Sequence, residues 1–218
     1  MGKKVGLLLS GCGVFDGSEI HEAVLSLLYL DKAGAEIVCM APDMDFPVVN
    51  HITQEETTGE KRNVLVEAAR IARGEIKNLK DVQASDLDAL IVPGGLGAAK
   101  NLSDFVVKGP DAVVLPEVKR ILQDMVSAGK PVGAICIAPA TLTKALADKK
   151  PEVTIGNDVN TASALEAMGA KHFDCSVDMI HVDEKNRLVT TPAYMLGPGI
   201  KDVASGIEKL VNKIVSMA

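Results

Sequence analysis

The cysteine at position 136 is the strongest candidate for chemistry in this sequence. It follows the apolar run 131–135, which predicts a buried strand, and it precedes small residues that begin a helix at Ala138. A side chain at such a junction stands over the edge of the sheet, which is the layout of a nucleophile elbow. A cysteine in an apolar run is more often a core residue. At this position, however, the amides and dipole of the following helix favour a reactive thiol with a lowered pKa.

Cys12 is the second candidate, because it also follows a predicted strand (5–9) and lies among glycines. Cys39 falls inside a strand and Cys175 begins the last third of the chain, so we interpret both as structural. The stretch 10–17 nearly matches a dinucleotide-binding fingerprint, but its third glycine comes one residue late. We therefore predict no dinucleotide and no other cofactor.

A nucleophilic thiol needs a partner, and Glu22 and His21 are the candidates near the start of the first predicted helix. If Glu22 meets Cys136, one proton must stay on the carboxyl group, which then donates to the thiolate. The alternative for Glu22 is a helix N-terminal acid that complements the dipole, and His21 is either a base or a surface residue. No histidines have metal-ligand spacing and there is no C-x-x-C, so we predict no metal.

The elements around these residues predict an α/β fold. Buried strands at 5–9, 36–41, 88–92 and 131–135 alternate with amphipathic helices, which indicates a parallel sheet covered on both faces. Residues 176–182 and 187–191 predict an antiparallel hairpin, and 200–217 a last helix. The apolar stripe of the first helix is expected to face the sheet; it consists of Ile20, Ala23, Val24, Leu27 and Leu28. We expect one domain over residues 1–218.

Residues 43–61 are the most polar and least regular stretch. Long connections inside compact domains are often lids, interface arms or binding loops. A solvated excursion explains the composition equally well.

Composition excludes several classes of protein. The 218 residues carry a net charge of -6 and are only 3% aromatic, which argues against binding to nucleic acid. No apolar run is long enough to span a membrane, and no signal peptide is evident. With four cysteines and no close pairing, we expect reduced thiols in a cytoplasmic protein.

Four motifs together resemble the ElbB-type (enhancing lycopene biosynthesis) proteins of the PfpI, or class I glutamine-amidotransferase-like, superfamily. They are SGCGVFDGSEIHEA at 10–23, PGGLGAAKNL at 93–102, CIAPA at 136–140 and TTPAYM at 190–195. The resemblance implies a flavodoxin-like three-layer α/β/α sandwich, a homodimer, an association with isoprenoid biosynthesis and a weak glyoxalase activity. The implied substrate is a small aldehyde, with glyoxal converted to glycolate without a cofactor.

Carried over residue by residue, the resemblance makes Cys136 the nucleophile and Glu22 its carboxyl partner. It assigns the oxyanion-binding amides and the pocket lining to Gly94, Gly95, Ile137, Thr191, Pro192 and Tyr194. Many members of the superfamily place a histidine where this chain has Gly156, so a protease or glutaminase triad looks incomplete. We therefore predict a glyoxalase-like enzyme. A redox-sensing module that uses Cys136 and an amidase-type hydrolase are the alternatives.

Overall fold

A seven-stranded sheet forms the middle of the protein in the computed structural model, which describes residues 2–218. Its strand order is β10-β11-β7-β6-β1-β2-β5, and every neighbouring pair is parallel except β10 with β11. The strands of this sheet are β1 (Lys4–Leu8), β2 (Glu36–Ala41), β5 (Lys77–Asn78), β6 (Ala89–Val92), β7 (Val132–Ile135), β10 (His181–Asp183) and β11 (Leu188–Thr191). The central strands are fully buried, as near-continuous apolar runs predict for a sheet covered on both faces.

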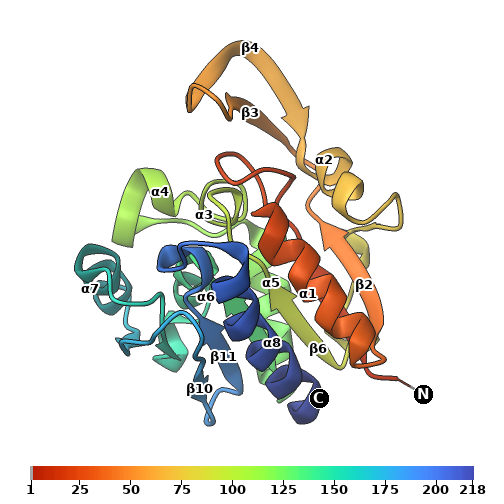
Figure 1. Cartoon of the computed structure of the whole chain (residues 1–218), viewed down its shortest axis with the longest axis vertical. Coiled ribbons are helices and arrows are strands. Elements are labelled where there is room, and N and C mark those ends of the chain that lie inside the picture. Colours follow the sequence, from red (N-terminus) through yellow and green to blue (C-terminus); the bar gives the residue numbers. More distant parts are fainter. Residues whose placement is uncertain (1) are drawn as a thin grey trace.

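Helices cover both faces of this sheet. On one face α1 (Ile20–Lys32) and α8 (Ile200–Met217) lie side by side, and on the other α5 (Pro116–Ser127) packs on α6 (Ala138–Ala145) (Figure 1). Shorter helices fill the connections: α2 (Val64–Ile71), α3 (Gly97–Lys100), α4 (Phe105–Lys108) and α7 (Val159–Ala167). The predicted three-layer α/β/α flavodoxin-like fold is confirmed.

The antiparallel element near the C-terminus is confirmed, but it is shorter than predicted. β10 begins at His181, so residues 176–180 lie outside the strand, and β11 begins at Leu188. A further small parallel pair, β8 (Glu152–Val153) with β9 (Lys171–His172), lies outside the main sheet. Runs of two residues carry too little periodicity to be recognised from sequence.

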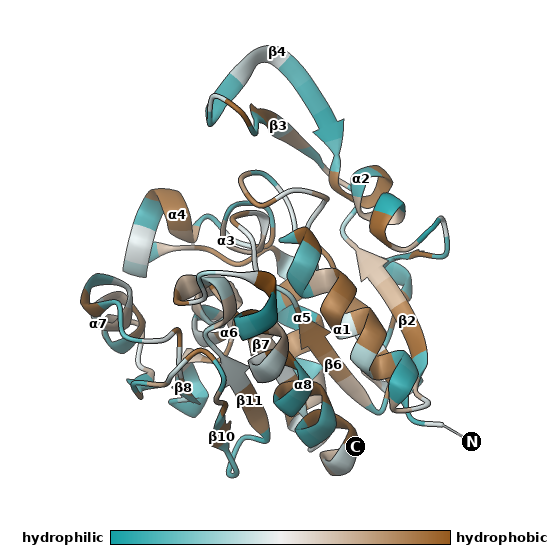
Figure 2. Ribbon diagram, viewed as in Figure 1, coloured by the Kyte–Doolittle hydropathy of each residue, from teal (hydrophilic) through white to brown (hydrophobic). Residues whose placement is uncertain are grey.

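The predicted apolar stripe of α1 is only partly buried: Ala23 is buried and Leu27 packs against the core, whereas the other three residues are exposed. Ile20, Val24 and Leu28 are each nearly half exposed, and much of α1 has the brown of hydrophobic residues in Figure 2. The buried face also includes Glu22 and Ser26, both fully buried. Burying polar groups costs free energy unless they are hydrogen-bonded, and both are: the Ser26 hydroxyl donates to the Glu22 carbonyl, and the Glu22 carboxyl group accepts from the Gly94 amide.

The polar stretch 43–61 is also more regular than predicted. It forms most of an antiparallel hairpin of β3 (Asp45–Asn50) and β4 (Glu55–Asn63), which projects from the body as an arm (Figure 1). β3 alternates, with Phe46 and Val48 buried, whereas β4 has no buried residue and is almost entirely hydrophilic in Figure 2. A strand without an apolar face gives no alternation to read, which is why the hairpin was missed. No helix in residues 2–218 has the length and hydropathy needed to cross a membrane.

Candidate active site

Cys136 occupies the turn between β7 and α6. Its backbone has φ 60°, the left-handed region that a non-glycine residue adopts only under constraint. The Cys136 amide donates to the Thr191 carbonyl at 3.0 Å, which ties the turn to β11. Cys136 is buried, with 7% of the residue's surface exposed. This is the strained strand-to-helix turn expected of an elbow.

Glu22 reaches the cysteine from α1 and is fully buried. Its Oε2 accepts a hydrogen bond from the Gly94 amide at 2.8 Å, and its Oε1 accepts one from the Tyr194 amide at 3.3 Å. The carboxyl group also hydrogen-bonds the Cys136 side chain. Three separate segments of the chain therefore meet at this one carboxyl group.

The turn after β6 fits closely between these groups. A Cβ added to Gly94 would lie 2.5 Å from the Cys136 Cβ and 2.7 Å from the Glu22 Oε2. Gly95 has φ +88°, and a Cβ there would lie 2.3 Å from the Glu19 amide nitrogen. The Glu19 amide donates to the Gly94 carbonyl at 2.9 Å. Glycine is needed at both positions because α1 and Cys136 approach the backbone directly.

Burial controls the charge of the pair. It raises the pKa of the Glu22 carboxyl from its ordinary 4.5 to about 8, and the nearby charge of Glu19 adds to the rise. Burial also raises the pKa of the Cys136 thiol, as does the charge of an ionised Glu22. The predicted lowering of the thiol pKa is therefore wrong for the resting pair, because the helix dipole does not outweigh desolvation. The amides of Gly95 and Ile137 act in the opposite direction, since they donate to the sulfur.

The three predicted oxyanion amides do not have the same surroundings. The amides of Gly95 and Ile137 are directed at the Cys136 sulfur, where an oxygen on a carbon bound to that sulfur would also come close. The Gly94 amide is already donated to Glu22. Its role is therefore to hold the carboxyl group, which corrects the prediction for Gly94.

The segment 191–194 supports the site from β11. The Thr191 hydroxyl donates to the Met179 carbonyl at 2.8 Å, so it does not face the sulfur, and Pro192 is buried in the turn that follows. The Tyr194 hydroxyl lies 2.7 Å from Nδ1 of His21, whose side chain is 52% exposed. His21 is thus a surface residue of α1 that joins the site through Tyr194.

No other histidine replaces the one that the resemblance leaves missing. Gly156 has φ +104°, and a Cβ there would lie 2.7 Å from the Leu196 Cγ, so Leu196 fills the space of a side chain. His172 Nε2 accepts from the Ile155 amide at 3.3 Å, and His181 stacks on Phe173 at 4.1 Å. Both imidazoles are therefore held within the β8–β10 region.

Sequence reasoning gave no role to Glu19. This residue is 8% exposed, caps α1 by accepting from the Glu22 amide at 2.7 Å, and raises the pKa of Glu22. The available signal was an acidic residue three positions before Glu22, at the place of a helix N-cap. Cys39 is buried, whereas Cys12 and Cys175 are half-buried. Within residues 2–218, no cluster of three histidine, cysteine, aspartate or glutamate side chains is arranged to hold a metal ion.

Two curated relatives are similar to nearly the whole chain. The human "glutamine amidotransferase-like class 1 domain-containing protein 3, mitochondrial" is 46% identical over 224 residues, which cover 98% of this chain and 83% of that protein. The rat "ES1 protein homolog, mitochondrial" is also 46% identical, over 98% of this chain and 84% of that protein. Both relatives are named as mitochondrial proteins, which contradicts the cytoplasmic localisation predicted from the sequence. A signal-peptide search and a cysteine count do not identify organelles.

The solved structures include a near relative. The crystal structure of an isoprenoid biosynthesis protein with an amidotransferase-like domain from Ehrlichia chaffeensis is 37% identical and has a TM-score of 0.91. The match covers 99% of this chain and 100% of that one. The model of the DJ-1/PfpI family matches residues 12–195, which include both Glu22 and Cys136. The chain therefore belongs to the DJ-1/PfpI family.

Proposed function

We propose that this protein is a cofactor-independent, glyoxalase-like enzyme that converts glyoxal to glycolate through Cys136. The observation that carries the proposal is the buried contact between a carboxyl group of raised pKa and a cysteine held at φ 60°. An acid that keeps its proton near neutral pH is the group needed beside a nucleophile that must gain and lose protons.

The first step is addition of the Cys136 sulfur to one aldehyde carbon of glyoxal, while an ionised Glu22 takes the proton from the thiol. A carbon–sulfur bond forms, the carbonyl π bond breaks, and the oxygen takes the negative charge. The amides of Gly95 and Ile137 lie beside the sulfur and stabilise that oxygen. The proton of the Glu22 carboxyl then gives a neutral hemithioacetal.

The second step moves a proton between the two carbons. Glu22, now ionised, removes the proton from the sulfur-bearing carbon to give an enediol, and returning a proton to the other carbon gives the glycolyl thioester. Water then hydrolyses the thioester, which releases glycolate and regenerates the thiol. The sum is glyoxal plus water giving glycolic acid, so no oxidant or reductant is required.

Trapping the thioester tests this route directly. Acid quenching during turnover, followed by peptide mass spectrometry, should show a glycolyl group on the peptide that contains Cys136. A Cys12→Ala variant should carry the same adduct, since Cys12 lies after a different strand. Turnover without any adduct on Cys136 would contradict the proposal. Peroxide-driven sulfinic acid formation at Cys136 without glyoxal turnover would favour a redox sensor instead.

We also propose that the chain is an ElbB-type protein associated with isoprenoid biosynthesis. The support is the printed name of the Ehrlichia chaffeensis protein, an isoprenoid biosynthesis protein, together with 37% identity across both chains. Deleting the gene in its own organism and measuring isoprenoid products tests this association separately from the chemistry. Unchanged isoprenoid levels would contradict it.

A homodimer is part of the same proposal. The support is the exposed apolar stripe of Ile20, Val24 and Leu28 on α1, which gives a helix face on which a second copy can pack. Val24→Glu should convert a dimer to a monomer in analytical ultracentrifugation. Val66→Glu, on the exposed side of α2, is the control and should leave the mass unchanged.

A further inference from the structure

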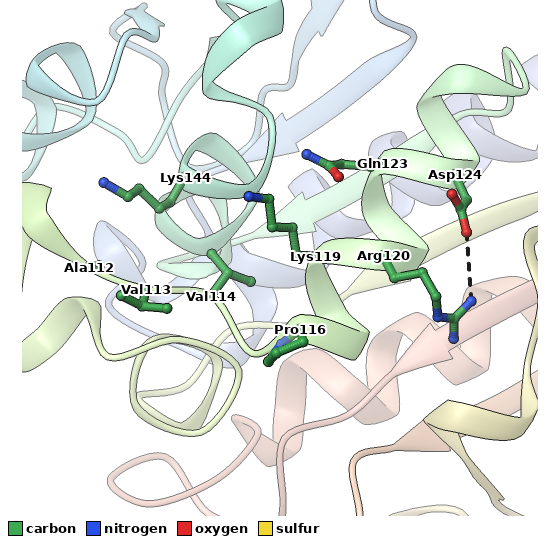
Figure 3. A pocket seen from close by; sticks show the side chains of 9 residues that line it. All are labelled: Ala112, Val113, Val114, Pro116, Lys119, Arg120, Gln123, Asp124 and Lys144. Atoms are coloured by element: carbon green, nitrogen blue, oxygen red, sulfur yellow. Dashed lines mark ion pairs between the residues drawn. The ribbon is translucent and has the colours of Figure 1, made fainter.

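A cavity of about 610 Å³ lies away from Cys136, where α5 and α6 meet the loop before α5. Figure 3 shows the side chains that line it, and none of them belongs to the site described above. The lining residues are Ala112, Val113, Val114, Pro116, Lys119, Arg120, Gln123, Asp124 and Lys144. Its volume is in the range of small-molecule sites, roughly 300–1,000 Å³.

The charge of this cavity is opposite to that of the protein. Three of the lining residues are basic and only Asp124 is acidic, although the whole chain carries a net charge of -6. Four other cavities in residues 2–218 are lined by at least as many acidic residues as lysines and arginines. A cation-rich cavity on an acidic protein selects for anions.

Two of the cations have no charged partner. Within the described chain, neither Lys119 nor Lys144 forms an ion pair, and the Lys144 Nζ donates to the neutral Pro110 carbonyl at 2.7 Å. Figure 3 shows these two lysines extending from α5 and α6, while Arg120 turns away toward Asp124, at 3.7 Å. Arg120 is further occupied by the Leu79 and Val82 carbonyls. The free positive charge therefore belongs to the two lysines.

The remaining wall of the cavity is apolar. Val113 is 62% exposed, and Ala112, Val114 and Pro116 complete that side. Pro116 begins α5, where the N-cap residue Leu115 offers no capping side chain and Glu117 in the first turn complements the helix dipole. The cavity thus has a cationic side and an apolar side.

We propose that this cavity binds a small phosphate-type anion that carries an apolar group. The ammonium groups of Lys119 and Lys144 bind the doubly charged head, the amide of Gln123 is within the same lining, and Val113 with Pro116 contacts the apolar group. A carboxylate offers only half the charge of a phosphate, and an apolar molecule alone leaves both ammonium groups unused. The site is separate from glyoxal chemistry and stands or falls independently of it.

Isothermal titration calorimetry with n-hexyl phosphate tests the proposal on the full-length protein. We expect saturable binding at one site, and binding weaker by about tenfold or more for inorganic phosphate and for n-hexanol, which each carry half of the ligand's chemistry. Affinity should fall as sodium chloride is added, because the contacts are between charges near the surface. Absence of saturable binding, or equal affinity for inorganic phosphate, would overturn the proposal.

Variants assign the binding to the cavity. Lys119→Gln/Lys144→Gln should weaken n-hexyl phosphate binding by about tenfold or more, whereas Lys77→Gln/Lys185→Gln removes the same charge elsewhere and should not. The single variant Lys119→Gln is expected to fold normally, because the Lys119 side chain is exposed and makes no described hydrogen bond. It should weaken n-hexyl phosphate binding by several-fold. Equal binding by all four proteins would show that the phosphate binds elsewhere and would overturn the proposal.

Discussion

Cys136 and Cys12 occupy similar places in the sequence and very different places in the structure. Each follows a buried strand of the same sheet, β7 or β1, and each is surrounded by small residues. Cys136 has φ 60°, accepts hydrogen bonds from two backbone amides and is hydrogen-bonded to the carboxyl group of Glu22. Cys12 is half-buried and lines a polar cavity of about 320 Å³ beneath the β3–β4 arm.

Most of the groups around Cys12 disfavour its thiolate form. Burial raises the pKa of this thiol, and the charges of Glu67 and Asp16 raise it further, with only Arg70 acting the other way. The nearest acids are also engaged in holding structure, since the Asp16 carboxylate accepts from the Val49 amide at 2.8 Å. The two cysteines therefore differ less in their access to solvent than in their donors, since backbone amides are directed at the sulfur of Cys136.

The largest expected effect separates the two cysteines. Cys136→Ala should reduce glycolate formation from glyoxal by on the order of 10³-fold or more, because the nucleophile is lost. Cys12→Ala should retain nearly full turnover. Product formation is followed by NMR of the glycolate methylene group. Normal turnover by Cys136→Ala would remove the distinction between the two regions.

Exchanging the acids for amides sharpens the comparison. Glu22→Gln keeps a hydrogen-bond donor beside the sulfur but cannot carry a proton between carbons, so turnover should fall by about 10²-fold or more. In the same variant, the rate at which iodoacetamide alkylates Cys136 should change far less than the turnover of glyoxal. Asp16→Asn, beside Cys12, should alter neither rate. If Glu22→Gln turned over glyoxal at the wild-type rate, the carboxyl group would have no part in proton transfer.

A glycine near Cys136 and a glycine near Cys12 should differ in the effect of replacement by alanine on turnover. Gly94→Ala forces a Cβ to 2.5 Å from the Cys136 Cβ, and we expect a loss of about 1–3 kcal/mol in unfolding free energy together with lost turnover. Gly13→Ala places a Cβ 2.5 Å from the His51 Nε2 at φ +138°. It should also cost about 1–3 kcal/mol through backbone strain. The turnover of Gly13→Ala per folded molecule should be unchanged. Urea unfolding gives the folded fraction, and glycolate formation gives the turnover.

The sequence predicts the features of the site that depend on local residue patterns, but not those that depend on contacts between distant segments. The strand ends, the glycine turn at 94–95 and the elbow at Cys136 could be predicted because apolar runs and glycines are local signals. Hydropathy did not predict the whole buried face of α1, because Glu22 and Ser26 are buried through hydrogen bonds to backbone partners, and only the expected contact with Cys136 indicated that Glu22 points inward. Hydropathy alone placed Ile20, Val24 and Leu28 there, and the structure exposes them.

The charge state of the site was equally beyond local patterns. A strand-to-helix junction in the sequence predicts a helix dipole beside Cys136. How deeply Cys136 and Glu22 are buried, however, depends on the packing of the whole sheet. That packing raises the pKa of both members of the pair. The roles of Gly94 and Glu19 were missed for the same reason, since each is defined by a contact with another segment.

Burial of Glu22 also predicts a pH dependence of stability, tested most cleanly without the coupled thiol. In Cys136→Ala the folded carboxyl should keep its proton up to about pH 8, whereas the unfolded one loses it near 4.5. The folded state then binds more protons in this window, so the unfolding free energy should fall as pH rises, by up to about 1.4 kcal/mol per pH unit. Below pH 4.5 the stabilisation is fully present. Cys136→Ala/Glu22→Gln should lack this slope in urea unfolding, and equal slopes would contradict the raised pKa.

The smallest expected effect concerns two histidines, His21 near the Cys136 site and His51 near Cys12. His21 is half exposed and acts on the site only through the Tyr194 hydroxyl, while the Tyr194 amide donates to Glu22. His21→Gln should therefore lower turnover by less than about tenfold, because it shifts Tyr194 without removing the proton carrier. His51→Gln loosens the arm over Cys12 and should leave turnover unchanged. If His21→Gln lost as much activity as Glu22→Gln, the proton would pass through the imidazole, and the difference between the regions would lie in their histidines rather than in the buried acid.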